Sequence, residues 1–195
     1  MALLVGLGNP GPKYDATRHN VGFALADSTA RALGAADWKT QGKALLTKVS
    51  PGSSVSVGST PLLIAKPQTF MNLSGEAVQS LMAFYKIQPA DVIVVTDDVT
   101  LPLGSIRVRA GGGHGGHNGL RDIIARVGEG FPRIRVGVGL CPPGRDLANF
   151  VLARFSAAET EALAPVFADF PKLLETGLTK GWELAATRFN RRTEG

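Results

Sequence analysis

The glycine-rich stretch from Gly6 to Gly22 carries side chains that can do acid–base chemistry. It contains His19, one of only three histidines in the chain, together with Asn9 and Tyr14. A neutral imidazole, with an ordinary pKa of about 6.5, can accept a proton from water near pH 7. The sequence contains no Gly-x-Ser-x-Gly nucleophile motif, so a base at His19 is expected to act on water.

A histidine base needs an acceptor on its second ring nitrogen to hold it in the basic tautomer. Asp97 and Asp98 are candidates, because they follow the apolar run 92–95 (Val-Ile-Val-Val), which is typical of a strand buried on both faces. The carboxyl end of such a strand is where α/β proteins place their sites. The spacing alone does not choose between the two aspartates.

Neutral amides gather in the same predicted loops. Asn9, Asn20, Asn72 and Asn118 all lie where a predicted strand has just ended or a helix is about to begin. Carboxamides bind peptide groups and can stabilise an oxyanion without adding charge. The set therefore favours a site that recognises a peptide or ester.

A dinucleotide cofactor is disfavoured, although Gly6-x-Gly8-x-x-Gly11 matches the fingerprint for one. That fingerprint works because a helix starts at once and points its N-terminus at the pyrophosphate. Here Pro10 and Pro12 flank the third glycine, and the helical pattern begins only near residue 19. We expect no cofactor.

A zinc hydrolase is the alternative that the three histidines raise. His19, His114 and His117 could supply three nitrogen ligands. Two glycines separate the last two histidines, and no carboxylate lies near them in the sequence. The single cysteine, Cys141, excludes a multi-cysteine metal site. We expect no metal.

Net charge suggests a polyanionic partner. The chain carries a formal charge of +5 and an isoelectric point near 9.7, which fits a nucleic acid. Several arginines flank the glycine-rich loop 111–119 and are candidates for phosphate contacts, namely Arg107, Arg109, Arg121, Arg133 and Arg135. An RNA-binding module without catalysis remains a second hypothesis.

Strands and helices alternate along the chain, which predicts one α/β domain over residues 1–195 with a twisted, mixed and mostly parallel sheet flanked by helices. Strands are expected at 3–7, 44–49, 55–57, 61–66, 92–95, 105–110 and 134–138, with 44–49 and 55–57 forming a hairpin. Helices are expected at 19–33, 74–85 and 120–127, and residues 141–149 as a surface loop.

The last part of the chain is predicted to be helical. Ser156 and Glu159 form a capping-box pattern, and helical spacing continues to about residue 190. Pro165 and Pro171 should kink or break this region, so two or three short helices are expected.

The composition, with 44% hydrophobic and 19% charged residues, is ordinary for a soluble globular protein. The first residues lack the basic segment of a signal peptide, and no apolar run approaches the roughly 18 residues of a membrane span. A soluble cytoplasmic monomer that does not contact a membrane is expected.

Taken together, four blocks resemble the bacterial peptidyl-tRNA hydrolase family. They are 6–22, 67–75 (Pro-Gln-Thr-Phe-Met-Asn-Leu-Ser-Gly), Asp97-Asp98 with 101–104, and 111–120, and the segment 150–152 also fits. The resemblance covers about residues 3–155 in register. It implies hydrolysis of the ester that joins a peptide to the 3′ end of tRNA, which returns tRNA to translation.

The resemblance also assigns roles. His19 resembles the family's base, Asp97 the residue that holds it in its basic form, and Asn9 the residue that distinguishes blocked from free aminoacyl groups. Four further residues resemble the family's contacts to peptidyl-tRNA: Tyr14, Phe70, Asn72 and Asn118. Met71 resembles a residue that lines the cleft. Arg109 and Arg135 lie where family members carry basic residues for the tRNA phosphates. Thr96 stands where a histidine or tyrosine is common, so we expect the surroundings of Asp97 to differ from those in the family.

Overall fold

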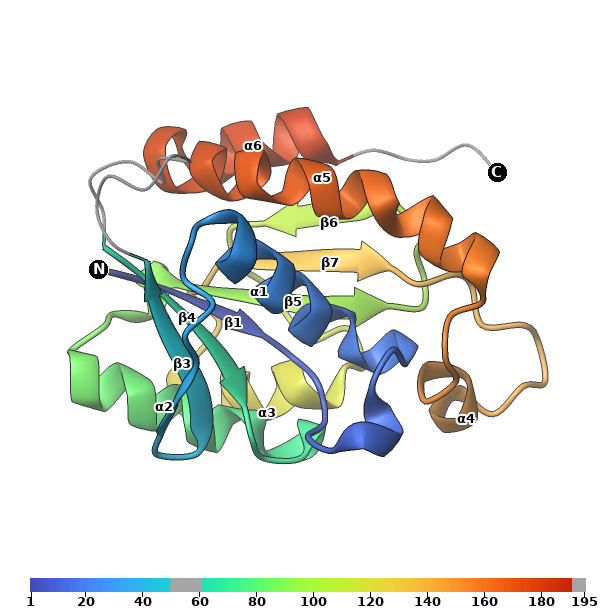
Figure 1. The fold of residues 1–195 in the computed structure, drawn as a ribbon, viewed down its shortest axis with the longest axis horizontal. Helices are drawn as coiled ribbons and strands as arrows, with labels where there is room; N and C mark the ends of the chain where they lie inside the picture. The colour runs from blue at the N-terminus through green and yellow to red at the C-terminus, as the bar shows by residue number, and fades with distance from the viewer. Residues whose placement is uncertain (50–60, 191–195) are drawn as a thin grey trace.

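A computed structural model describes residues 1–49 and 61–190. Its centre is one seven-stranded mixed sheet with strand order β2-β3-β4-β1-β5-β7-β6 (Figure 1). The strands are β1 Ala2–Gly6, β2 Lys39–Gln41, β3 Ala44–Val49, β4 Leu62–Pro67, β5 Val92–Asp98, β6 Ile106–Arg109 and β7 Arg133–Gly137.

The four central strands, β4, β1, β5 and β7, run parallel, whereas β2, β3 and β6 pair antiparallel at the edges. The parallel register brings the carboxyl ends of β4, β1 and β5 to one edge of the sheet. The loops after β1 and β4 carry Asn9 and Phe70, and the two aspartates are the last residues of β5, so topology gathers the candidate site.

Helices cover both faces of the sheet (Figure 1). One core lies under α1 Val21–Ala32, α5 Ala157–Lys180 and α6 Trp182–Phe189, and the other lies under α2 Ser74–Tyr85 and α3 Asn118–Val127. Alternate residues of β1 enter the two cores, with Leu4 in the first and Leu3 in the second, as the period of a strand requires. The 3-10 helices are Pro12–Tyr14, Arg18–Asn20, Met71–Leu73 and Pro89–Asp91.

Two glycines allow the close packing that brings the site together. A Cβ on Gly22 would come 2.6 Å from the Val95 carbonyl oxygen, so only glycine lets the start of α1 lie against β5. A Cβ on Gly119 would come 2.7 Å from the sulfur of Met71, so glycine also lets α3 begin beside the 3-10 turn at Met71–Leu73. The first contact places His19 next to the end of β5.

The C-terminal region forms two helices, but the prediction that Pro165 and Pro171 divide it into short helices is wrong. Helix α5 runs for 24 residues with Pro165 and Pro171 inside it, and the chain breaks only at Gly181. Each proline costs about 3 kcal/mol in a helix interior. Pro165 is exposed, so the carbonyl that it leaves unpaired can reach water, and α5 buries an apolar stripe that outweighs this cost, made of Leu163, Val166, Phe170, Leu173 and Leu174.

The structure also differs from the prediction in a surface loop and at one edge of the sheet. The predicted loop 141–149 contains the start of α4, Leu147–Val151, which Asp146 caps by accepting a hydrogen bond from the Asn149 amide. The short edge strand β2 pairs with β3 and was not predicted. The hairpin partner expected at 55–57 lies outside the described residues. None of the helices in the described ranges is long and apolar enough to cross a membrane.

Candidate active site

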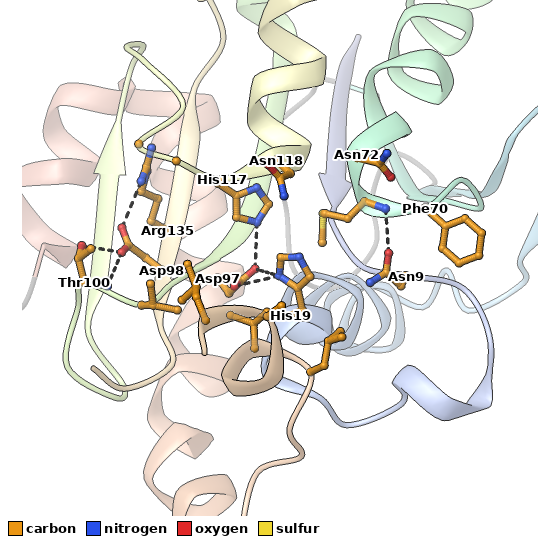
Figure 2. A pocket seen from close by; sticks show the side chains of 18 of the residues that line it. Asn9, His19, Phe70, Asn72, Asp97, Asp98, Thr100, His117, Asn118 and Arg135 are labelled. Atoms are coloured by element: carbon orange, nitrogen blue, oxygen red, sulfur yellow. Dashed lines mark hydrogen bonds and ion pairs between the residues drawn. The ribbon is translucent and has the colours of Figure 1, made fainter. Parts of the chain in front are cut away.

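A cleft of about 700 Å³ opens at the carboxyl edge of the sheet. Figure 2 shows the side chains of His19 and Asp97 facing each other in this cleft. Predicted residues from five separate segments line it: Asn9, Tyr14, His19, Phe70, Met71, Asn72, Asp97, Asn118 and Arg135. Among the residues to which the family resemblance assigns a role, Arg109 alone is not in the lining of this cleft; it lies in a neighbouring groove. Side chains of α4 form part of the opposite wall.

His19 and Asp97 are in direct contact. The Nδ1 of His19 lies 2.9 and 3.0 Å from the two carboxylate oxygens of Asp97 (Figure 2). Burial alone would raise the pKa of this carboxyl, but the positive charge that His117 and His19 carry when protonated, together with their hydrogen bonds, outweighs burial and lowers it. An ionised carboxylate only accepts, so Nδ1 carries the proton and Nε2 keeps the lone pair of a base.

His117 also contacts Asp97, which the sequence reasoning did not foresee. Its Nε2 lies 3.0 Å from the Oδ1 of Asp97 and 2.5 Å from the hydroxyl of the fully buried Thr96. Its Nδ1 accepts the backbone amide of Leu120 and so caps helix α3. A clue in the sequence is that His117 directly precedes Asn118, so a loop that brings one to the cleft brings the other.

The hydrogen bonds around His117 do not suit a metal. The donor atoms of His19, Asp97 and His117 lie within 4.8 Å of one another. In a neutral imidazole, however, an Nδ1 that accepts from Leu120 leaves the proton on Nε2, where a cation would need a lone pair. The three-histidine set of the alternative zinc hypothesis does not form within the described ranges, because His114 instead accepts the Gly116 amide in its own loop.

Asn9 is held so that its amide NH₂ faces the cleft. Its side-chain oxygen accepts the backbone amide of Met71 at 2.8 Å, which leaves the two N–H donors for a ligand (Figure 2). Its backbone N–H and C=O bond the side chain of Asn20, each at 2.9 Å. Asn20 is therefore a buried brace for Asn9 rather than part of the cleft.

Two aromatic rings stand at the cleft. Tyr14 and Phe70 meet edge to face with ring centroids 6.4 Å apart, and Phe70 is 53% exposed. Both line the cavity with Asn72 and Asn118. An exposed aromatic beside polar amides offers a flat surface for a base or a ribose.

The second aspartate serves a different partner. Asp98 accepts hydrogen bonds from the backbone and hydroxyl of Thr100 at 2.8 and 2.6 Å, and it pairs with Arg135 at 3.3 Å. Arg135 also donates to the carbonyl of Gly113. The geometry thus separates the two carboxylates, since Asp97 faces the histidines and Asp98 faces an arginine.

Arg135 connects the cleft to a basic groove. Arg135 lines both the cleft and this groove. The other residues that line the groove are Arg107, Arg109, Arg133 and the glycines 111–113. The Arg133 guanidinium is buried and donates to backbone carbonyls of the surrounding loops. Arg109 is exposed, and Arg107 and Arg135 are half-buried at the same groove, so these three arginines are the charges there that are available to an anion.

The comparisons with known proteins agree on one family. The sequence model described as "Peptidyl-tRNA hydrolase" matches residues 3–195. The peptidyl-tRNA hydrolase of Thermotoga petrophila is 44% identical, with 96% of each chain covered. The chloroplastic peptidyl-tRNA hydrolase of Arabidopsis thaliana is 47% identical over 97% of this chain, which spans 65% of that longer relative.

Solved structures extend the likeness to three dimensions. The crystal structure of peptidyl-tRNA hydrolase from Acinetobacter baumannii superposes with a TM-score of 0.86 at 30% sequence identity, and the match covers 98% of this chain and 95% of that one. Family match, sequence relatives and fold therefore agree, and the chain belongs to the peptidyl-tRNA hydrolase family.

Proposed function

We propose that this protein hydrolyses the ester bond between the peptide and the 3′-terminal ribose of peptidyl-tRNA, with His19 as the base. The observation that supports this most directly is the contact of His19 Nδ1 with the buried carboxylate of Asp97, which leaves Nε2 free to take a proton. The reaction is carboxylic ester hydrolysis. It releases tRNA for reuse in translation.

The chemical step uses one water. His19 Nε2 removes a proton as the water oxygen attacks the ester carbonyl carbon, and Asp97 stabilises the imidazolium that forms. The negative charge on the carbonyl oxygen is met by amide N–H donors of Asn72 or Asn118, which line the same cleft. When the tetrahedral intermediate collapses, the carbon–oxygen bond to the ribose breaks and His19 returns the proton to that oxygen.

Asn9 reads the substrate on the peptide side. Its NH₂ donates to the carbonyl oxygen of the peptide group that blocks the amino end of the aminoacyl residue. A free aminoacyl-tRNA presents an ammonium at this point, and a donor facing a cation leaves both groups unpaired. The site therefore rejects aminoacyl-tRNA, with Met71 holding the Asn9 side chain in place.

The tRNA side of the substrate meets aromatic rings and arginines. Tyr14 and Phe70 offer surfaces on which the terminal nucleotide stacks. Arg109 and Arg135 contact phosphates where the cleft continues into the basic groove. We further propose that residues 1–195 work as a single domain, as a monomer in the cytoplasm, without a cofactor or a membrane partner.

A deacylation assay with the purified protein tests this function. An N-acetylated aminoacyl-tRNA and the matching free aminoacyl-tRNA are compared under the same conditions. We expect release of the acetylated amino acid and almost none of the free one. Binding of both tRNAs without release of either would instead support an RNA-binding module without catalysis.

A further inference from the structure

Arg18, the residue before His19, is buried in a tightly bonded environment. Its side chain is 9% exposed, and its guanidinium donates to the carbonyl oxygens of Ala153 at 3.3 Å and Arg154 at 2.9 Å. One terminal nitrogen also lies 2.6 Å from a carboxylate oxygen of Glu159. A buried cation needs such partners, because an unpaired charge removed from water is strongly destabilising.

Two phenylalanine rings complete the enclosure. The guanidinium carbon lies 4.7 Å from the ring centre of Phe150 and 5.2 Å from that of Phe155. Cation–π contacts of this kind strengthen when water is excluded. Arg18 therefore fixes its own backbone against the segment 150–159.

Backbone hydrogen bonds join the same two segments. The Arg18 amide donates to the Ala153 carbonyl at 3.0 Å, and the Phe155 amide donates to the Ala16 carbonyl at 3.2 Å. A β-bridge links Thr17 to Arg154. The turn that carries His19 is thus bonded directly to the chain between α4 and α5.

Glu159 joins this turn to the start of α5. Its second carboxylate oxygen accepts the Ser156 amide at 2.8 Å and completes the capping box. This backbone hydrogen bond is the largest influence on its pKa, which is lowered overall; burial opposes the shift and the charge of Arg18 supports it. One carboxylate therefore both caps α5 and pairs with Arg18.

We propose that Arg18 and Glu159 are positioning residues for the base. The Arg18–Glu159 pair ties the first turn of α5 to the turn that carries His19, and so holds the imidazole against Asp97. This inference rests on the proposed function of His19. It adds a role for two residues that are not in the lining of the cleft.

Breaking the Arg18–Glu159 pair should lower kcat. A displacement of about 1 Å at a reacting group can cost as much as 10²-fold in rate. Loosening the turn lets the His19 ring leave the carboxylate of Asp97 and exchange its tautomer, so part of the protein lacks a basic Nε2. Substrate contacts are unchanged, so KM should stay within about twofold while kcat falls.

Glu159→Gln is the sharpest test. Glutamine keeps an oxygen to accept the Ser156 amide, but it loses the charge and turns an N–H donor toward Arg18. Glu161→Gln is the matched control, since it removes the same charge from an exposed position on the same helix. Arg18→Lys is a second variant, which keeps the charge but not the forked geometry.

We expect Glu159→Gln to lower kcat by about 5- to 20-fold, with KM unchanged and Glu161→Gln behaving as wild type. Nitrogen-15 NMR of the imidazoles should show mixed tautomers for His19 in Glu159→Gln and in Arg18→Lys, against one tautomer in the wild type. A kcat equal to that of Glu161→Gln, a change confined to KM, or an unaltered His19 tautomer overturns the proposal.

The proposed function and the positioning role of Arg18 and Glu159 can be tested separately. If His19→Ala hydrolyses peptidyl-tRNA at the wild-type rate, the role of His19 as the base is wrong; if the wild-type protein hydrolyses none, the proposed function itself is wrong. The NMR comparison of Glu159→Gln and wild type still reports whether the Arg18–Glu159 pair holds the His19 ring, because it requires no substrate.

Discussion

The Nε2 of His117 lies 3.0 Å from the Oδ1 of Asp97, the same carboxylate oxygen that lies 2.9 Å from His19 Nδ1. The two imidazole rings are 5.2 Å apart between centres. One carboxylate therefore orients the ring of His19 and is itself held from the other side by His117. Activity should depend on this whole arrangement and not on His19 alone.

Replacing Asp97 by asparagine should reduce kcat by about 10- to 10³-fold with the fold intact. An amide can turn its NH₂ toward Nδ1 of His19, and this favours the tautomer whose Nε2 already carries a proton. The dependence of kcat on pH, measured for Asp97→Asn and wild type, checks this. Identical profiles would show that Asp97 does not govern the base.

Protonation of Asp97 at acid pH should lower the free energy of unfolding. Its pKa is lower in the folded protein than the ordinary value of 3.8, so the folded state binds fewer protons than the unfolded chain near that pH. The stabilisation is then present above pH 3.8 and is lost as the pH falls below it toward the folded pKa. Urea unfolding at several pH values should give a shallower acid decline for Asp97→Asn; equal slopes contradict the coupling.

Thr96→Val tests the environment of His117. Valine has the shape of threonine but lacks the hydroxyl that lies 2.5 Å from His117 Nε2. The histidine keeps its bond to Asp97, so we expect a loss in kcat of about 2- to 10-fold, whereas His117→Ala should lose about 10- to 10²-fold. Steady-state kinetics of both variants decide this, and equal losses would mean that the hydroxyl matters as much as the ring.

Asn9→Asp should shift the choice of substrate. The new carboxylate can still accept the Met71 amide, but it offers an anion where the wild type offers N–H donors. The ratio of kcat/KM for acetylated to free aminoacyl-tRNA should fall by about 10²-fold or more. A variant that loses rate equally on both substrates would remove Asn9 from substrate discrimination.

Arg109→Ala should weaken tRNA binding and reduce the slope of log affinity against log salt concentration by about 1, as expected for one lost phosphate contact. Arg31→Ala, an exposed change at the far end of α1, is the matched control. Arg135→Ala should show the same salt effect but also lower stability, because it leaves the buried Asp98 without its cation. A wild-type salt slope would exclude Arg109 from the phosphate contacts.

Much of the site could be predicted because its residues follow strands that the sequence marks clearly. The apolar runs of β1 and β5 indicate parallel neighbours, and parallel strands bring Asn9 and Asp97 to one edge. The choice between Asp97 and Asp98 could not be made this way, because it depends on which of two adjacent side chains faces His19 and which faces Arg135.

Other features depend on packing that no local pattern reports. Helix α5 continues through Pro165 and Pro171 because of an apolar stripe that only the assembled sheet can bury. His117 reaches Asp97 because Gly119 lets α3 approach Met71. Arg18 and Glu159 are 141 positions apart, and their pairing has no signal in either segment.

The rate of peptidyl-tRNA deacylation by His19→Ala, measured against wild type, tests the central claim most directly. We expect His19→Ala to lose roughly 10²–10⁴-fold in kcat while its thermal stability and tRNA affinity are retained, because only the proton acceptor is gone. Turnover at the wild-type rate by the folded variant would contradict it.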